Sequence, residues 1–202
     1  MATSTKSRST KARSASNGSA FNWGSAGAIA GVALGGAALA FAANFGRKFA
    51  VQGISATKGN WAESLAAEHD AVLALFDRML ETDDSQVMMR KMLLMKLGHA
   101  LDKHAYAEEH VIYPALREAN ERSDAEELET EHGEVKTFLY RLHHLAADDP
   151  SWIETVREFR QSVEAHAKLE EEQIFPRLRG EIDDTLDQRL TKELNKAGFL
   201  MA

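Results

Sequence analysis

The chain has 202 residues, enough for one domain of ordinary size and an appendage. Its formal net charge of −7 at pH 7 argues against a nucleic-acid-binding protein, which is normally basic. Because it contains no cysteine, disulfides, thiolate zinc sites and iron–sulfur clusters are excluded, and any bound metal would need nitrogen and oxygen ligands. The low proline content and the many Glu, Lys and Arg residues favour an all-α fold.

Two segments of unlike composition form the N-terminal part of the chain. Residues 1–20 are rich in Ser, Thr, Lys and Arg and are predicted to be a disordered basic tail. Residues 21–48 are rich in Ala and Gly, carry no charge before Arg47, and are long enough to span a bilayer as a helix. We therefore predict a transmembrane anchor there, with a cleaved signal peptide or a flexible linker as the alternatives.

A stripe of small residues lies within this predicted anchor. Gly27, Gly31 and Gly35 follow one another at four-residue steps, so they share one face of a helix. Because such stripes let membrane helices approach closely, this one predicts a homo-oligomer in the membrane. Basic residues flank both ends of the segment, so the sequence leaves the side of the membrane open.

Residues 58–180 are predicted to form an up-down-up-down four-helix bundle. Asn60 with Glu63 makes a capping box that opens a first helix, which extends to about Leu80. After a polar break, a second helix extends to about Arg117, and Pro114 is expected to bend or end it locally.

The third and fourth helices follow the same logic. Ser123, with Glu three residues later, is expected to cap a helix to about Leu145, and Asp149 followed by proline opens one toward Pro176. Residues 181–202 are predicted to be a short helical extension that ends at Gly198, with Leu at i, i+4 and i+8. Long helices with short connections are typical of a bundle.

One sequence pattern occurs twice. Residues 104–114 and residues 166–176 both read His-Ala-x-x-Glu-Glu-x-x-Ile-aromatic-Pro. A Glu-His dipeptide precedes each copy, at 68–69 and at 131–132. A repeat of this length, built on His and Glu, indicates a symmetric metal site between two helical hairpins.

Six residues of this repeat are candidate metal ligands. Residues four apart lie on one helix face, and here each such face is also apolar, so these side chains should point into the core. The six are His69, His104, Glu108, His132, His166 and Glu170. A single His-x-x-x-Glu pair is normally a surface pair, but matched copies on four helices favour ligands. Buried without partners, these groups would be costly, whereas a pair of divalent ions, iron or else manganese or zinc, would satisfy them.

Other polar residues of the repeat are expected to support the ligands. Glu109 and Glu171 lie off the buried face and are predicted to be solvated or to accept hydrogen bonds from ligand histidines. Tyr140 is predicted to reach the site as an outer donor from the third helix. No catalytic residue and no organic cofactor site is assigned.

The residues from about Asn60 to Leu178 resemble the hemerythrin-like (HHE cation-binding) domains. The resemblance implies a four-helix bundle with a non-haem di-iron centre, bridged by the two carboxylates and by an oxo or hydroxo group. One iron would take His69 and His104, the other His132 and His166, with Glu108 and Glu170 bridging. Oxygen-carrying hemerythrins have a further His where this chain has Lys136, which puts reversible oxygen transport in doubt. Ferritin-like proteins fit poorly, because their Glu-x-x-His spacing occurs here only once.

Three functions remain open from the sequence. The first is a sensor or stress-protective redox module whose di-iron centre meets O2, NO or H2O2. The second is a di-iron oxidoreductase or an iron donor for repair, so that enzymatic activity is left undecided. The third is a metal-free helical interaction module on a membrane anchor.

Overall fold

The computed structural model describes Met1 and residues 59–201, all of the latter in one helical unit or its connections. The predicted tail beyond Met1 and the predicted anchor at residues 21–48 lie outside the described residues, so both stay predictions. Within the part of the chain that is described, no helix is long and apolar enough to cross a membrane.

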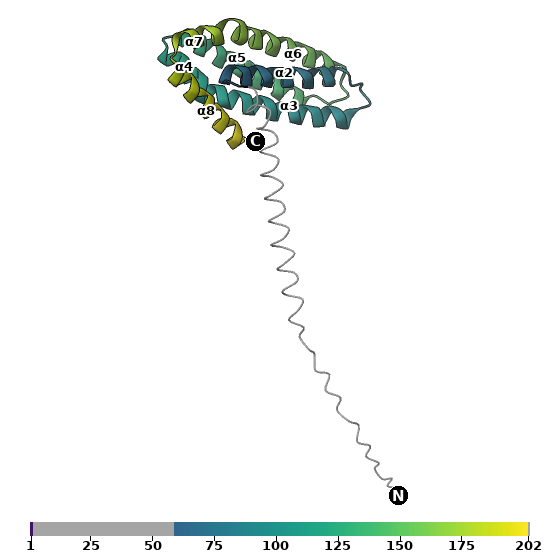
Figure 1. Cartoon of the computed structure of the whole chain (residues 1–202). Coiled ribbons are helices and arrows are strands. Elements are labelled where there is room, and N and C mark those ends of the chain that lie inside the picture. Colours follow the sequence, from purple (N-terminus) through teal and green to yellow (C-terminus); the bar gives the residue numbers. More distant parts are fainter. Residues whose placement is uncertain (2–58, 202) are drawn as a thin grey trace. The chain divides into compact units, whose positions relative to one another are not determined.

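Four long helices make up the body of the unit, and they run side by side in Figure 1. They are α2 (Trp61–Leu80), α3 (Val87–Ala107), α5 (Arg122–His144) and α6 (Pro150–Leu169). Three shorter or terminal helices complete it: α4 (Tyr113–Glu118), α7 (Phe175–Glu181) and α8 (Asp184–Met201). The described residues contain helices and no strands, which confirms the predicted all-helical fold.

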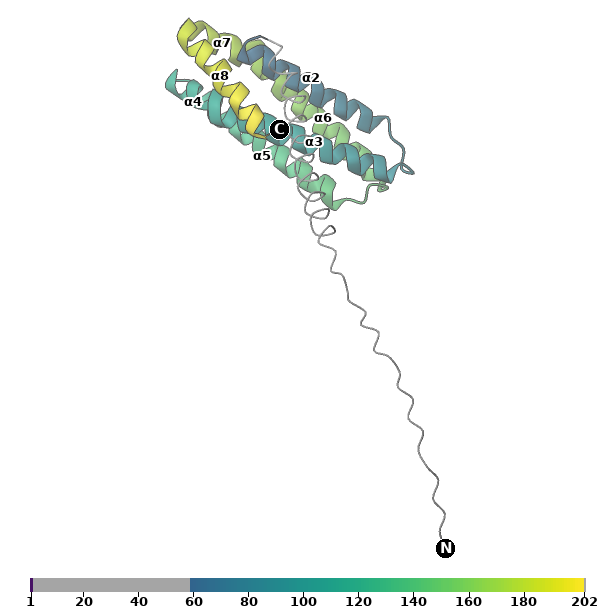
Figure 2. The same ribbon diagram turned by 60° about the horizontal axis from the view of Figure 1, so that its bottom comes forward.

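The long helices pack in a ring. Helix α2 packs on α3 and on α6, while α5 packs on α6 and on α3. Helix α8 packs on α2 and α3 and on the turn that follows α3, and both views place it at the end of the bundle with α4 and α7 (Figures 1 and 2). The C-terminal extension therefore forms part of the packed unit.

A wide helical turn follows α3, and an equivalent one follows α6. In η1 (Glu108–Ile112) and η2 (Glu170–Ile174) the backbone adopts π-helix geometry, so the N–H of Tyr113 donates to the carbonyl of Glu108, five residues back. Pro114 was expected to bend or end the second helix, but the irregular turn lies before it. The wide turn comes first, and the proline stands in the first turn of α4, where its missing N–H costs little. Such π turns are frequent at functional sites.

The predicted helix ends are confirmed at two places and wrong at two others. Asn60 caps α2 by accepting from the N–H of Glu63, and Asp149 caps α6 by accepting from that of Ser151. The predicted cap at Ser123 is wrong, because α5 begins earlier, at Arg122, without a side-chain cap. Instead, Arg177 of α7 pairs with acidic residues at the start of α5. Helix α8 also continues through Gly198, which is buried, to Met201.

Apolar side chains form two clusters along the bundle. One, which includes Trp61, Leu65 and Phe175, lies at the end with α7 and α8. The other, which includes Val72 and Phe159, lies toward the α2–α3 connection. Leu65 and Val72 lie two turns apart on α2 but belong to different clusters. His69 lies between them on the same helix, in a layer that separates the two clusters. This middle layer holds the polar repeat.

Candidate metal centre

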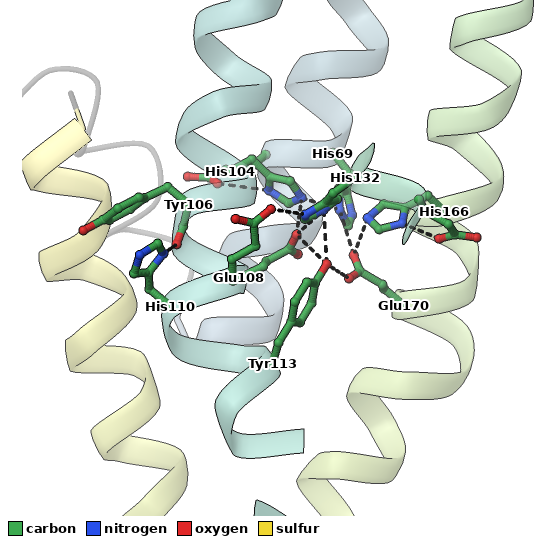
Figure 3. Close-up of polar contacts among 12 residues, drawn as sticks. His69, His104, Tyr106, Glu108, His110, Tyr113, His132, His166 and Glu170 are labelled. Carbon is green, nitrogen blue, oxygen red and sulfur yellow. Dashed lines mark hydrogen bonds and ion pairs between the residues drawn. The ribbon is translucent and has the colours of Figure 1, made fainter. Parts of the chain in front are cut away.

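Each of the four long helices brings one histidine to the middle layer. The four are His69, His104, His132 and His166, and each is between 3% and 6% exposed. Their rings point toward one another in Figure 3. The Nε2 atoms of His69 and His104 are 3.0 Å apart, so two ring nitrogens from neighbouring helices face the same point.

The two buried glutamates stand at the first residues of the wide turns and face the histidines. Glu108 Oε2 lies 3.1 Å from His104 Nε2 and 3.3 Å from His132 Nε2. Glu170 Oε2 lies 3.3 Å from His69 Nε2 and 3.4 Å from His166 Nε2. Each carboxylate therefore reaches one histidine from the α2–α3 hairpin and one from the α5–α6 hairpin.

A second carboxylate lies behind every one of these imidazoles, against Nδ1. The Nδ1–O distances are 2.7 Å for His69–Glu171, 3.3 Å for His104–Glu68, 3.1 Å for His132–Glu109 and 2.7 Å for His166–Glu131. A carboxylate at Nδ1 favours the tautomer with a proton there, which leaves the Nε2 lone pair directed at the centre. This arrangement is what a metal-binding histidine requires.

The sequence anticipated two of these four carboxylates. The structure places Glu109 and Glu171 behind two of the central histidines, as one of the two expected roles requires. Glu68 and Glu131 were not assigned a role, although the repeated Glu-His dipeptide was the signal that could have found them. Each of them contacts the histidine of the next helix and not its own neighbour in sequence.

The tyrosine of the site is Tyr113, and the prediction for Tyr140 is wrong. Tyr140 is 64% exposed and packs against His144. Eight helical residues after His132, its side chain is rotated by about 80° and displaced by about 12 Å along the axis. Tyr113 is fully buried, and its hydroxyl lies 3.1 Å from His132 Nε2 and 3.4 Å from Glu170 Oε1.

The π turn explains why helical periodicity in the sequence did not place Tyr113 at the site. In a regular α-helix, a residue five positions after Glu108 would point about 140° away from it. The wide turn brings the two side chains close enough for the Tyr113 hydroxyl to lie 3.5 Å from Glu108 Oε2. Burial, and then the charges of Glu108 and Glu170, raise the pKa of Tyr113, so its hydroxyl stays protonated and can donate.

The buried carboxylates and histidines of the middle layer shift one another's pKa values. Burial opposes ionisation of Glu108, but His104 and His132 outweigh it and lower the pKa of this carboxyl. Burial, followed by the negative charge of Glu108, raises the pKa of Glu170. Burial would also raise the pKa of Glu68, yet His104 and Lys103 lower it to about 2. Burial would lower the pKa values of His69, His104 and His166, but the carboxylates around them outweigh it and raise these values.

The donor atoms fit a bound cation. Three buried atoms of the centre, Glu108 Oε1, His166 Nε2 and Glu170 Oε2, form no hydrogen bond with the described residues, and the last two have only ion-pair contacts of 3.3–3.4 Å. Two nitrogens each about 2.1 Å from one ion and at a right angle to each other would be about 3.0 Å apart, as the His69 and His104 atoms are. Imidazole and carboxylate donors suit iron, manganese or zinc.

The ligand atoms gather in two groups that share one residue. In each group the atoms lie within 4.8 Å of one another. The first group is His69, His104, His166 and Glu170, and the second is Glu108, His132 and His166. All six predicted ligands are therefore brought together, and their arrangement offers two adjacent cation positions.

A small cavity adjoins the histidine layer. Its volume is about 20 Å³, roughly the space that one water-sized molecule needs. Apolar side chains one turn from each histidine surround it, one per helix: Val72, Leu101, Val135 and Val163. Such a cavity admits a small uncharged molecule beside the histidines and disfavours a charged one.

His110 and His144 stay outside this cluster, and each packs against a tyrosine. His110 lies in the wide turn but packs against Tyr106, away from the four central rings in Figure 3. His144 packs against Tyr140 on the surface of α5. Neither histidine has a histidine at the equivalent position of the other hairpin, and both are exposed.

Comparison with known proteins agrees with the geometry. The profile of the Hemerythrin HHE cation binding domain matches residues 62–178, a range that includes all six central residues. Among solved structures, a hemerythrin HHE cation binding domain-containing protein from Mycobacterium kansasii is similar, with a TM-score of 0.62 and 25% sequence identity. The match covers 70% of this chain and 86% of that one.

A curated relative is also similar over much of the chain. A DNA nickase from Nostoc sp. is 26% identical over 146 residues, which is 72% of this chain and 41% of the relative. The chain thus spans less than half the length of that relative. Helix α8 begins after the last residue matched by the HHE domain profile.

Proposed function

Because the chain belongs to the hemerythrin HHE cation-binding domain family, we propose that its bundle holds two iron ions and binds or reacts with O2, NO or H2O2. In this function the protein acts as a sensor or as a stress-protective redox module. The observation that carries the proposal is the pair of buried glutamates, each of which contacts one histidine from both hairpins.

The contacts support a specific division of ligands. His69 and His104 would hold one ion, since their Nε2 atoms face each other at 3.0 Å. His132 and His166 would hold the other, and Glu108 and Glu170 would be shared by both. Manganese or zinc would find the same donors acceptable, so iron is part of the proposal.

The chain's own residues prepare the site for a small ligand. When bound, a pair of iron ions supplies electrons and a binding position for such a ligand. The four apolar side chains around the cavity exclude bulk water and large molecules, and the carboxylates at Nδ1 fix the orientation of each imidazole. The Tyr113 hydroxyl, kept protonated, can donate a hydrogen bond within the layer.

Oxygen-carrying hemerythrins have a further histidine at the position of Lys136, and this lysine does not replace that ligand. It is exposed and reaches Glu109 at 3.5 Å, so it adds no nitrogen to the centre. The name of the Nostoc relative describes activity on DNA. We do not propose that activity for this chain, because its net charge of −7 disfavours binding to nucleic acid.

Metal content per chain tests the proposal most directly. The full chain would be loaded anaerobically with Fe(II), freed of excess metal, and analysed by elemental mass spectrometry and optical spectroscopy. We expect two irons per chain in the native protein, at most one after Glu108→Ala, and two after Glu172→Ala, a control in η2 that is exposed. A folded native protein that retains no metal would reject the centre and favour the metal-free interaction module.

Turnover separates a sensor from an oxidoreductase. The loaded protein would be mixed with excess H2O2 or NO, with the remaining ligand followed in time. A single stoichiometric reaction favours a sensor, whereas many cycles per chain favour an enzyme. Release of iron to an acceptor protein during the reaction would favour the repair function.

A further inference from the structure

The centre is close to two-fold symmetric. The α2–α3 hairpin and the α5–α6 hairpin supply equivalent residues, which take equivalent contacts. The equivalent pairs are His69 and His132, His104 and His166, Glu108 and Glu170, Glu68 and Glu131, and Glu109 and Glu171. A symmetric centre of this kind would offer two cation positions of equal strength.

Apart from Tyr113, whose counterpart is Phe175, Lys103 breaks this symmetry. It is only 7% exposed, and its Nζ pairs with one oxygen of Glu68, whose other oxygen lies 3.3 Å from His104 Nδ1. The equivalent residue in the other hairpin is Ala165, which is exposed. In the part of the chain that the structure describes, a buried cation therefore lies behind the carboxylate on the His104 side of the centre and not on the His166 side.

The two equivalent carboxylates consequently differ in their surroundings. Glu68 is 16% exposed and shares its charge between Lys103 and His104, whereas Glu131 is 32% exposed and contacts His166 at 2.7 Å. Among the described residues, no lysine or arginine pairs with Glu131. The other lysine near the centre, Lys136, reaches Glu109 from the solvent, where water and salt weaken its effect.

The different surroundings of Glu68 and Glu131 should change how strongly His104 and His166 bind a metal ion. A carboxylate that accepts the Nδ1 proton makes the imidazole a stronger electron donor at Nε2. A buried ammonium neutralises that carboxylate and adds positive charge near the cation, in surroundings where charges are poorly screened. The imidazole of His104 should therefore donate less strongly than that of His166.

We propose that Lys103 makes the two cation positions unequal, so that the position at His69 and His104 binds its ion more weakly than the position at His132 and His166. The inference rests on the proposed two-metal centre. It assigns Lys103 as a positioning and tuning residue, which contacts the carboxylate behind a ligand and not the ion itself. The weaker position is then the last to fill and the first to lose its metal.

Calorimetric titration of the metal-free full chain with Co(II) or with anaerobic Fe(II) tests this. We expect two binding events in the native protein. Lys103→Met keeps the length of the side chain without its charge and should tighten the weaker event by about tenfold. Lys103→Arg should retain the native pattern. Lys136→Met, the matched control, removes the same charge from an exposed partner of Glu109 and should change neither event by more than about twofold.

Ala165→Lys provides a test that leaves Lys103 in place. It puts a lysine beside Glu131, so it should weaken the tighter event and bring the two affinities together. Thermal unfolding of each metal-free variant controls for a merely structural role of the Lys103–Glu68 pair. If Lys103→Met fails to fold, Ala165→Lys still tests whether a lysine behind the carboxylate weakens metal binding.

The outcomes separate this inference from the proposed function. Two equal binding events in the native protein, or equal effects of Lys103→Met and Lys136→Met, would overturn the role of Lys103 and leave the centre intact. Loosening of metal by Lys103→Met would also overturn it. A folded native protein that binds no metal at all would instead reject the proposed function.

Discussion

The middle layer of the bundle and the apolar layers on either side use the same helices in opposite ways. In the apolar layers, side chains such as Phe76 and Phe159 are fully buried and pack ring against ring. In the middle layer, equally deep positions carry His69, Glu108 and Glu170. Burial stabilises the first kind of layer and destabilises the second. The apolar layers therefore hold the fold, and the middle layer relies on them until a cation balances its charge.

The largest effect that this comparison predicts is for Phe159→Ala. Phe159 contacts Phe76 edge to face and stacks on Phe138, at centroid distances of 4.9 Å. We expect the free energy of unfolding to fall by about 3–5 kcal/mol, measured by denaturant titration. Tyr140→Ala, which truncates an exposed ring, should change it by less than about 0.5 kcal/mol. A loss of metal stoichiometry in the folded Phe159 variant would show that the layers are not independent.

Removal of metal should have the next largest effect. Chelation is expected to leave the helical circular dichroism in place while lowering the free energy of unfolding. The loss would be about 2.7 kcal/mol where the free metal had been at about 100 times its dissociation constant. Unfolding of the bundle on chelation would mean that the apolar layers are insufficient by themselves to hold the fold.

The sequence predicted the apolar layers and the ligand set for the same reason. Periodicity places residues on faces, and the spacing from His104 on α3 to Glu108, the residue that follows α3, needs nothing else. It could not place Tyr113, because the π turn changes which residues share a face. Tyr140 was chosen by the regular α-helical period and lies on the surface instead.

Contacts between distant elements were also beyond the sequence. The Glu-His dipeptides were visible, but which histidine each glutamate contacts depends on how the hairpins pack. The start of α5 depends on ion pairs with Arg177, more than fifty residues away in the chain, and not on a local cap at Ser123. Such long-range contacts are set by the tertiary structure, so local patterns do not reveal them.

The substitution Tyr113→Phe changes the middle layer and leaves the apolar layers intact. The hydroxyl contacts His132 Nε2 and both central carboxylates, whereas the equivalent residue of the other half, Phe175, has none. In the metal-free protein, its loss leaves buried carboxylate oxygens with fewer partners, so we expect a destabilisation of about 1–2 kcal/mol. In the metal-loaded protein the ions would satisfy those oxygens, and the loss should be smaller. Denaturant titrations of both forms would measure it, and equal losses would contradict a cation at the carboxylates.

The smallest effect is expected outside both layers, at the cap of the helix that brings His69 to the centre. The side chain of Asn60 accepts a hydrogen bond of 3.1 Å from the N–H of Glu63, so Asn60→Ala should cost about 1 kcal/mol of unfolding free energy. Asn60→Asp keeps an acceptor and should cost little. Because nine helical steps, about 13.5 Å along the axis, lead from Asn60 to His69, metal stoichiometry should stay unchanged in both variants. A drop in bound metal after Asn60→Ala, at full helicity, would show that the start of α2 sets the position of His69 and that the centre depends on more than its own layer.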